Sequence, residues 1–177
     1  MNTLGLICRE ANARHLSFLV VGGHAVIVHG HGRNTFDLDL AIRRADQPAW
    51  MALAKSLGYT IHHEGPAFVQ FTPPSAETLP LDLMLLNDST FAKLHADSLP
   101  ASPSTSGARV VSLLHLLALK CHAIRHGHAG RIVKDADDVI RLVEVNGLDV
   151  TQPELKELLL KHGPEDLYEK LRRLSTR

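Results

Sequence analysis

The stretch GGHAVIVHGHGRNTFDLDL, residues 22–40, decides the fold of this chain. The run before it, SFLVV at 17–21, is short and apolar, as expected of a buried strand. The two glycines allow a tight turn, and a helix is expected from about residue 24 to 30. The segment TFDLDLAI, 35–42, then alternates polar and apolar residues, which is typical of a half-buried strand. The sequence therefore predicts strand, glycine turn, helix and strand in succession.

The same patterns extend outward along the chain. They predict strands at 59–63, 67–72 and 79–86 and helices at 2–15, 47–57 and 89–97. The Pro/Ser-rich stretch LPASPSTSG, 99–107, predicts a linker, after which four helices are expected at 112–126, 132–146, 154–162 and 165–174. The fold class is therefore α/β (α+β): a mixed sheet flanked by helices in a domain at 1–107, followed by a helical domain at 108–177.

The composition limits the classes of function. With 177 residues and 45% hydrophobic residues, the chain can bury a core. Its 19 basic and 19 acidic residues cancel, so any site for a polyanion has to be local. Cys8 and Cys121 form no CxxC pair, which indicates a reducing, cytoplasmic compartment. The longest apolar stretches fall short of the roughly 20 residues of a membrane helix, so no membrane association is expected.

Three acidic residues stand in otherwise apolar strands. Asp37 and Asp39 are two residues apart, so their side chains are expected on one face of a strand, with Leu38 and Leu40 on the other. Asp82 stands alone in the apolar run LPLDLMLL, 79–86. Neighbouring carboxylates repel unless cations neutralise them, and Mg²⁺ prefers such oxygen ligands. We therefore predict a two-ion magnesium site, which Mn²⁺ could also occupy, if the two strands are adjacent. The alternative is that these acids mark an exposed strand edge.

Several residues near the acidic pair could bind an anion. Gly22 and Gly23 let the backbone approach a ligand closely, and a helix start favours phosphate. Arg33 and Thr35 share the parity of the two acids if the strand begins that early, so they are expected at the same site. The alternatives are a plain tight turn for the glycines and a solvated loop for Arg33.

Together these residues resemble a known superfamily. The run at 22–40, with Asp82 on a later strand, is similar to the minimal nucleotidyltransferases of the DNA polymerase β-like superfamily. Within it, the chain looks most like the AbiEii-like toxins of type IV toxin–antitoxin systems, because Lys120 and the run KDADD, 134–138, stand at matching places. The resemblance covers about two-thirds of the chain and implies a nucleotide-binding enzyme, with ATP among its candidate nucleotides and a cognate antitoxin as a candidate partner.

The resemblance also implies a role for each acid of the site. Asp37 and Asp39 would bind both metal ions, while Asp82 would bind one and help to activate the acceptor hydroxyl. The reaction implied is transfer of NMP from an NTP, with release of pyrophosphate, to an RNA 3′ end or a protein side chain. The alternative acceptor is a small molecule, because aminoglycoside and lincosamide nucleotidyltransferases share the GG and DxD pattern on chains of similar size.

The implied nucleotide-binding residues come from two parts of the chain. Gly22 and Gly23 would cradle the triphosphate, with His24 beside them, while Lys120 would contact the phosphates and Asp138 would support the pocket. The superfamily usually has a serine where this chain has Gly23, and the serine hydroxyl binds phosphate. This departure leaves open an inactive homologue that binds a nucleotide or a partner without turnover.

Lys120 also has an independent argument from its surroundings. Its helical neighbours, Leu116, Leu117, Ala123 and Ile124, are all apolar, so its ammonium group needs an anionic partner unless it extends to water. Asp135 is expected to be an ordinary surface charge.

Overall fold

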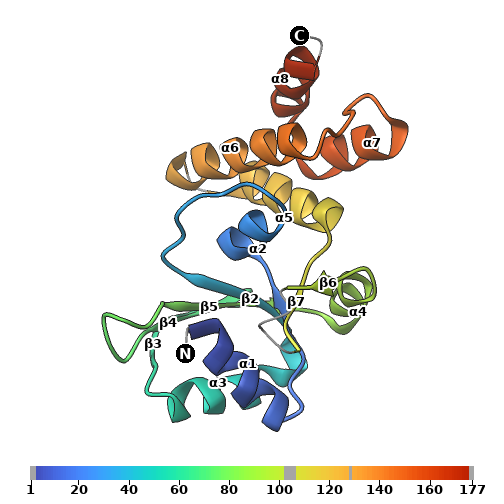
Figure 1. Ribbon diagram of the computed structural model, residues 1–177. Coiled ribbons are helices and arrows are strands. Elements are labelled where there is room, and N and C mark those ends of the chain that lie inside the picture. Colours follow the sequence, from blue (N-terminus) through green and yellow to red (C-terminus); the bar gives the residue numbers. More distant parts are fainter. Residues whose placement is uncertain (1–2, 102–106, 128, 176–177) are drawn as a thin grey trace. The chain divides into compact units, whose positions relative to one another are not determined.

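A computed structural model describes residues 3–101, 107–127 and 129–175. Within these ranges, seven strands form one mixed sheet in the order β3-β4-β5-β2-β1-β7-β6 (Figure 1). Its centre is β5 (Leu81–Leu86), β2 (Leu38–Arg43) and β1 (Leu19–Val20). The strands β2 and β5 run parallel, whereas β1 and β2 are antiparallel. The predicted α/β class with a mixed sheet is therefore confirmed.

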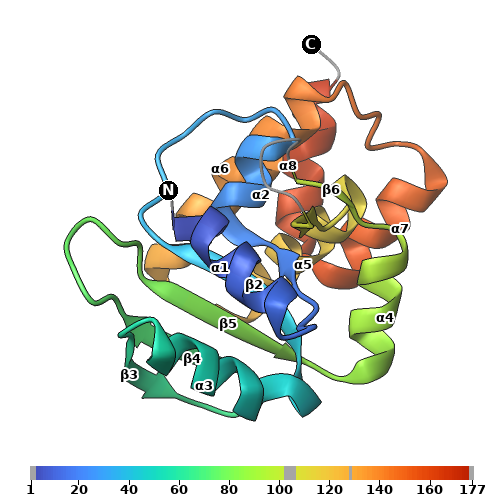
Figure 2. The same ribbon diagram turned by 60° about the horizontal axis from the view of Figure 1, so that its bottom comes forward.

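The other elements of the first part of the chain surround this centre. They are the helices α1 (Thr3–Ala13), α2 (Gly22–Val28), α3 (Gln47–Ser56) and α4 (Asp88–Ala96), the short 3-10 helix η1 (Arg44–Asp46), and the strands β3 (Thr60–Glu64), β4 (Phe68–Thr72), β6 (Leu99–Pro100) and β7 (Arg109–Val110). The helices α1 and α3 lie together on one face of the sheet (Figures 1 and 2). A hydrogen bond of 3.0 Å from Arg14 to Ser56 joins the chain just after α1 to the end of α3.

The core of the sheet follows the predicted alternation. Leu38, Leu40 and Ile42 of β2 are fully buried, and Trp50 of α3 packs edge-on against Phe18 with ring centroids 5.5 Å apart. Burial of such side chains contributes about 1.5–3 kcal/mol each to folding. Because β2 is fixed by this apolar face, Asp39 has to point to the opposite face.

Four helices follow the sheet, and their bounds are α5 (Leu113–His126), α6 (Ala129–Val145), α7 (Pro153–His162) and α8 (Glu165–Ser175). The helix α5 packs against α6 and α7. Arg125 of α5 donates to the carbonyl oxygens of Lys161 at 2.6 Å, of Leu160 at 2.9 Å, and of Gly163. These bonds satisfy carbonyl groups that the end of α7 would leave without an intrahelical donor.

The chain divides into two compact units, and their boundary differs from the expected one. Unit 1 comprises residues 1–25 and 33–112, and unit 2 comprises 26–32 and 113–177. The expected linker at 99–107 begins inside the sheet, because its first two residues form β6, which pairs with β7 in an antiparallel ladder. Residues 102–106 of that stretch lie outside the described residues. Two-residue strands such as β6 and β7 carry no alternation that the sequence could reveal.

Among the described residues, no helix has both the length and the apolar composition needed to cross a membrane.

Candidate metal centre

The register of the sheet brings the three acids together. In the parallel pair of β2 and β5, Asp39 lies directly opposite Asp82. Asp37 precedes β2 by one residue, so the strand begins later than the predicted residue 35. One carboxylate oxygen from each of the three residues lies within 4.8 Å of the others, and all three side chains are half-buried. The adjacency that the sequence left open is therefore present in the structure.

Neutral donors hold two of these carboxylates. The hydroxyl of Thr35 donates to Asp37 Oδ1 at 2.9 Å, and the amide of Gln70 donates to Asp82 Oδ2 at 2.8 Å. Sequence reasoning missed Gln70, which lies opposite Asp82 in the antiparallel pair of β4 and β5. In the sequence, Gln70 stands out only as a polar residue between the apolar Val69 and Phe71. Its position next to Asp82 depends on the pairing of β4 with β5, which the sequence does not show.

The glycine turn packs directly against this cluster. Gly22 has a φ of +58°, a backbone conformation that residues other than glycine rarely adopt. A Cβ built at Gly22 would lie 1.8 Å from Asp39 Oδ2, so a side chain at this position would collide with the carboxylate. A Cβ at Gly23 would lie 2.2 Å from Thr35 Oγ1 and 3.2 Å from Arg33 Nη1. The predicted neighbours Arg33 and Thr35 thus lie at the turn, although both precede β2.

His24 follows the glycines, and its surroundings favour the neutral imidazole. Burial lowers its pKa, the negative charge of Asp37 opposes that shift, and the positive charge of Arg33 adds to it. Its Nε2 atom is buried and has no hydrogen-bond partner among the described residues. The imidazole therefore adds no positive charge to the cluster at neutral pH.

The donor set fits a hard divalent cation. Three carboxylates converge from β5, from β2 and from the residue just before β2, and the missing side chain of Gly22 leaves the backbone in contact with one of them. Oxygen ligands of this kind suit Mg²⁺ and Mn²⁺, whose charge would offset the repulsion among the acids. Asp37, Asp39 and Asp82 are the residues that could hold such an ion.

We expect Gln70→Leu to weaken Mn²⁺ binding by about tenfold, since partners behind the direct ligands typically contribute 10–100-fold. The substitution removes the donor that fixes the Asp82 carboxylate. Titration of the purified protein with Mn²⁺, followed by electron paramagnetic resonance, measures the loss. Gln152→Leu is a matched control, because Gln152 also donates to an aspartate, Asp149, outside the cluster. Equal affinities for the Gln70 variant and the wild type would contradict the prediction.

Lys120 and Asp138 belong to a separate cluster in unit 2. The Lys120 ammonium lies 2.6 Å from Asp135 Oδ1 and 2.7 Å from Asp138 Oδ2, and all three side chains are buried. The expectation that Asp135 is a surface charge is wrong, because its side chain is only 4% exposed. Arg131 also reaches Asp135, at 3.4 Å. Lys120 therefore has the anionic partners that its apolar surroundings required.

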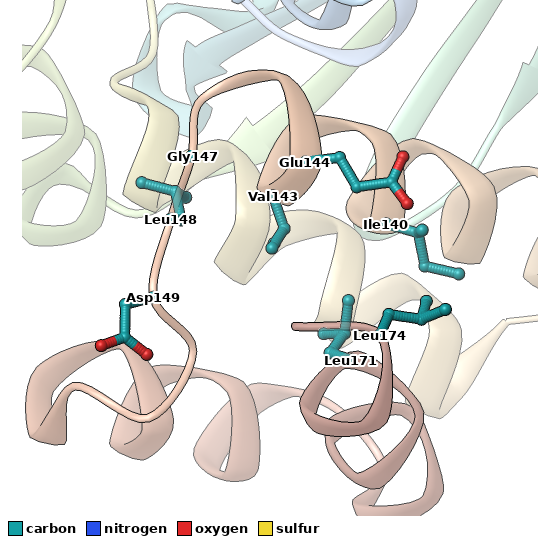
Figure 3. Close-up of a pocket in the computed structure, with 8 residues that line it drawn as sticks. All are labelled: Ile140, Val143, Glu144, Gly147, Leu148, Asp149, Leu171 and Leu174. Atoms are coloured by element: carbon teal, nitrogen blue, oxygen red, sulfur yellow. The ribbon is translucent and has the colours of Figure 1, made fainter. Parts of the chain in front are cut away.

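Unit 2 also contains a pocket of about 330 Å³ between α6, α8 and the turn after α6 (Figure 3). Leu171 and Leu174 of α8 face Ile140 and Val143 of α6 across it. The lining is mostly apolar, and it shares no residue with the acidic cluster. We therefore regard it as a packing gap and place the candidate site at the three acids.

Comparisons with known proteins agree with this geometry. No family model matches the chain, and no curated protein matches its sequence. Among solved structures, a nucleotidyltransferase-like protein from Paracoccidioides brasiliensis is 17% identical with a TM-score of 0.60, and the match covers 98% of this chain and 88% of that one. The antibiotic-resistance factor ANT(2″)-Ia is 16% identical with a TM-score of 0.64, covering 96% and 93%.

A third match is LnuA, a lincosamide antibiotic adenylyltransferase solved with lincomycin bound. It is 17% identical with a TM-score of 0.55, and the match covers 81% of this chain and 96% of that one. The chain therefore has a nucleotidyltransferase-like fold. Similarity to the AbiEii-like group in particular stays a prediction.

Proposed function

We propose that the protein is a Mg²⁺-dependent nucleotidyltransferase that transfers NMP from an NTP to an acceptor hydroxyl. The observation that carries the proposal is the pairing of Asp39 with Asp82 across β2 and β5, with Asp37 completing a cluster of ligand atoms within 4.8 Å. The fold supports it, because proteins named as adenylyltransferase and nucleotidyltransferase-like share this arrangement of elements.

The proposed reaction is a displacement at the α-phosphorus. The acceptor oxygen forms a bond to the α-phosphorus, the bond from that phosphorus to the β-bridging oxygen breaks, and pyrophosphate leaves. When bound, two Mg²⁺ ions would stabilise the attacking and leaving oxygens. Asp37 and Asp39 would hold the ions whose positive charge attracts the triphosphate, and Asp82 would take the proton of the acceptor hydroxyl. Catalysis is then mainly positioning and charge neutralisation.

The nucleotide would lie at the glycine turn. Gly22 and Gly23 expose backbone next to Asp39 and Thr35, so a triphosphate could approach the acids without meeting side chains. Arg33 supplies a positive charge at the same place, and His24 stays neutral beside it. In unit 2, contact of Lys120 with phosphate and support from Asp138 are the alternative to a structural role for their buried ion cluster.

Two classes of acceptor have specific support. The resemblance to AbiEii-like toxins favours an RNA 3′ end or a protein side chain, in a cytoplasmic protein with a cognate antitoxin. A small hydroxylated molecule is favoured by the zero net charge, which gives no general attraction to a long polyanion. It is also favoured by the likeness to an antibiotic-resistance factor and to an adenylyltransferase solved with lincomycin. The basic residues that could contact RNA are partly engaged, because Arg125 caps α7 and Arg172 pairs with Glu169.

The acceptor is tested by incubating the protein with Mg²⁺ and each of four α-labelled NTPs. One reaction contains no added acceptor, and parallel reactions contain total RNA, a protein extract, tobramycin or lincomycin. Each reaction is repeated with EDTA, which removes the metal. Label in one acceptor that disappears with EDTA supports the enzyme and identifies the class. Nucleotide binding without label in any reaction would support the alternative of a domain that binds without turnover, and would overturn the proposal.

A further inference from the structure

The side chain of Thr35 fills the space that a side chain at position 23 would need. A Cβ built at Gly23 would lie 2.2 Å from Thr35 Oγ1 and 2.8 Å from Thr35 Cβ, distances below 3.0 Å that real Cβ atoms essentially never show. The φ of Gly23 is outside the left-handed range, unlike that of Gly22, so its backbone conformation does not require glycine. The requirement at this position comes chiefly from Thr35, because the next nearest atom, Arg33 Nη1, lies farther away at 3.2 Å and ends a flexible side chain.

Thr35 in turn controls a carboxylate of the acidic cluster. Its hydroxyl lies 2.9 Å from Asp37 Oδ1, and because an ionised carboxylate only accepts, the hydroxyl proton is donated to Asp37. Asp37 precedes the first ladder residue of β2, so the sheet does not hold it as firmly as Asp39. The bond from Thr35 therefore fixes the rotation of the Asp37 carboxylate.

We propose that Thr35 is a positioning residue for Asp37 and that Gly23 is glycine in order to leave room for it. Contacts from Gly23 to Thr35 and from Thr35 to Asp37 then join the glycine turn to the cation site. This inference rests on the proposed function, because it assigns Thr35 a role in ordering one ligand of that same site. It also explains why glycine replaces the usual serine at position 23 without assuming that the protein is inactive.

The first test measures Mn²⁺ affinity by electron paramagnetic resonance without nucleotide. Thr35→Val keeps the branched shape and removes the hydroxyl, so we expect binding to weaken by about tenfold, at the lower end of the effect of such partners. Thr35→Ser keeps the hydroxyl and should restore affinity to within roughly twofold of the wild type. A role in packing alone would give the reverse order, because valine preserves the volume and serine does not. Thermal unfolding of each variant verifies that it is folded.

The second test is a double-mutant cycle between the two positions. Gly23→Ala should displace the Thr35 side chain and weaken Mn²⁺ binding by about the same tenfold. In a protein that already carries Thr35→Gly, both Oγ1 and Cβ of Thr35 are absent, so adding Gly23→Ala should change the affinity by no more than roughly twofold. Additive effects of the two substitutions would overturn the inference, as would wild-type affinity in Thr35→Val.

Failure of the inference can be separated from failure of the proposed function. If the wild type binds Mn²⁺ no better than Asp39→Asn, there is no cation site at the acids and both claims fall. If the wild type binds and Asp39→Asn does not, while Thr35→Val matches the wild type, the cation site stands and only the role of Thr35 is overturned.

Discussion

Asp39→Asn should lower Mg²⁺-dependent NMP transfer by about three orders of magnitude. Asp39 lies opposite Asp82 in the parallel pair of β2 and β5 and packs against Gly22, so it connects the acids to the glycine turn. Without this carboxylate, the metal ions would stabilise the charge of the transition state by several kcal/mol less. Each 1.36 kcal/mol changes the rate by a factor of about ten. Transfer of label from an α-labelled NTP to the identified acceptor measures kcat and KM for both proteins.

The same substitution should raise the stability of the metal-free protein. Like charges on neighbouring strands destabilise a sheet, by an amount we take as roughly the 0.2–1 kcal/mol of other cross-strand pairs, and asparagine keeps the shape without the charge. The free energy of unfolding in urea with EDTA present should therefore increase by that amount. Glu77→Gln is the control, because it removes one charge from an exposed residue. Full activity in Asp39→Asn, or a loss of stability without metal, would show that the acids have another role.

The sequence predicted the parts of the fold that depend on local pattern. The alternation around Leu38 and Leu40 correctly placed Asp39 on the opposite face, and the helices were predicted to within a few residues at most ends. The sequence could not predict which strands are neighbours. The approach of Asp82 and Gln70 depends on pairing between segments far apart in the chain, and no local preference determines that register.

For Lys120, too, the local sequence predicted the environment of the side chain but not the residues that contact it. Its apolar helical neighbours correctly indicated a buried ammonium that needs an anion. The pattern of α6 was less informative, because Asp135 could equally have faced water. In the structure Asp135 and Asp138 are one helical turn apart and both point at Lys120. With both acids at hydrogen-bond distance, the lysine completes a buried ion cluster inside unit 2, and this favours a structural role over contact with phosphate.

Lys120→Met should therefore destabilise the protein by about 3–5 kcal/mol, the range for removing one partner of a buried ion pair. Methionine fills the space of the lysine stem, so the cost comes from two buried carboxylates that lose the Lys120 ammonium, with Arg131 still 3.4 Å from Asp135. The change is measured as the free energy of unfolding in urea. Lys134→Met, at an exposed position of α6, is the matched control and should stay within about 0.5 kcal/mol of the wild type.

Two further variants separate the structural role from contact with the nucleotide. Replacing the whole cluster, with Lys120→Met, Asp135→Leu and Asp138→Leu together, removes the buried charges and should recover much of the lost stability, because hydrophobic residues of similar volume often replace buried ion clusters without loss. If Lys120 instead contacts phosphate, Lys120→Met will unfold like the wild type and its KM for the NTP will rise. That result would contradict the structural role and would assign Lys120 to nucleotide binding.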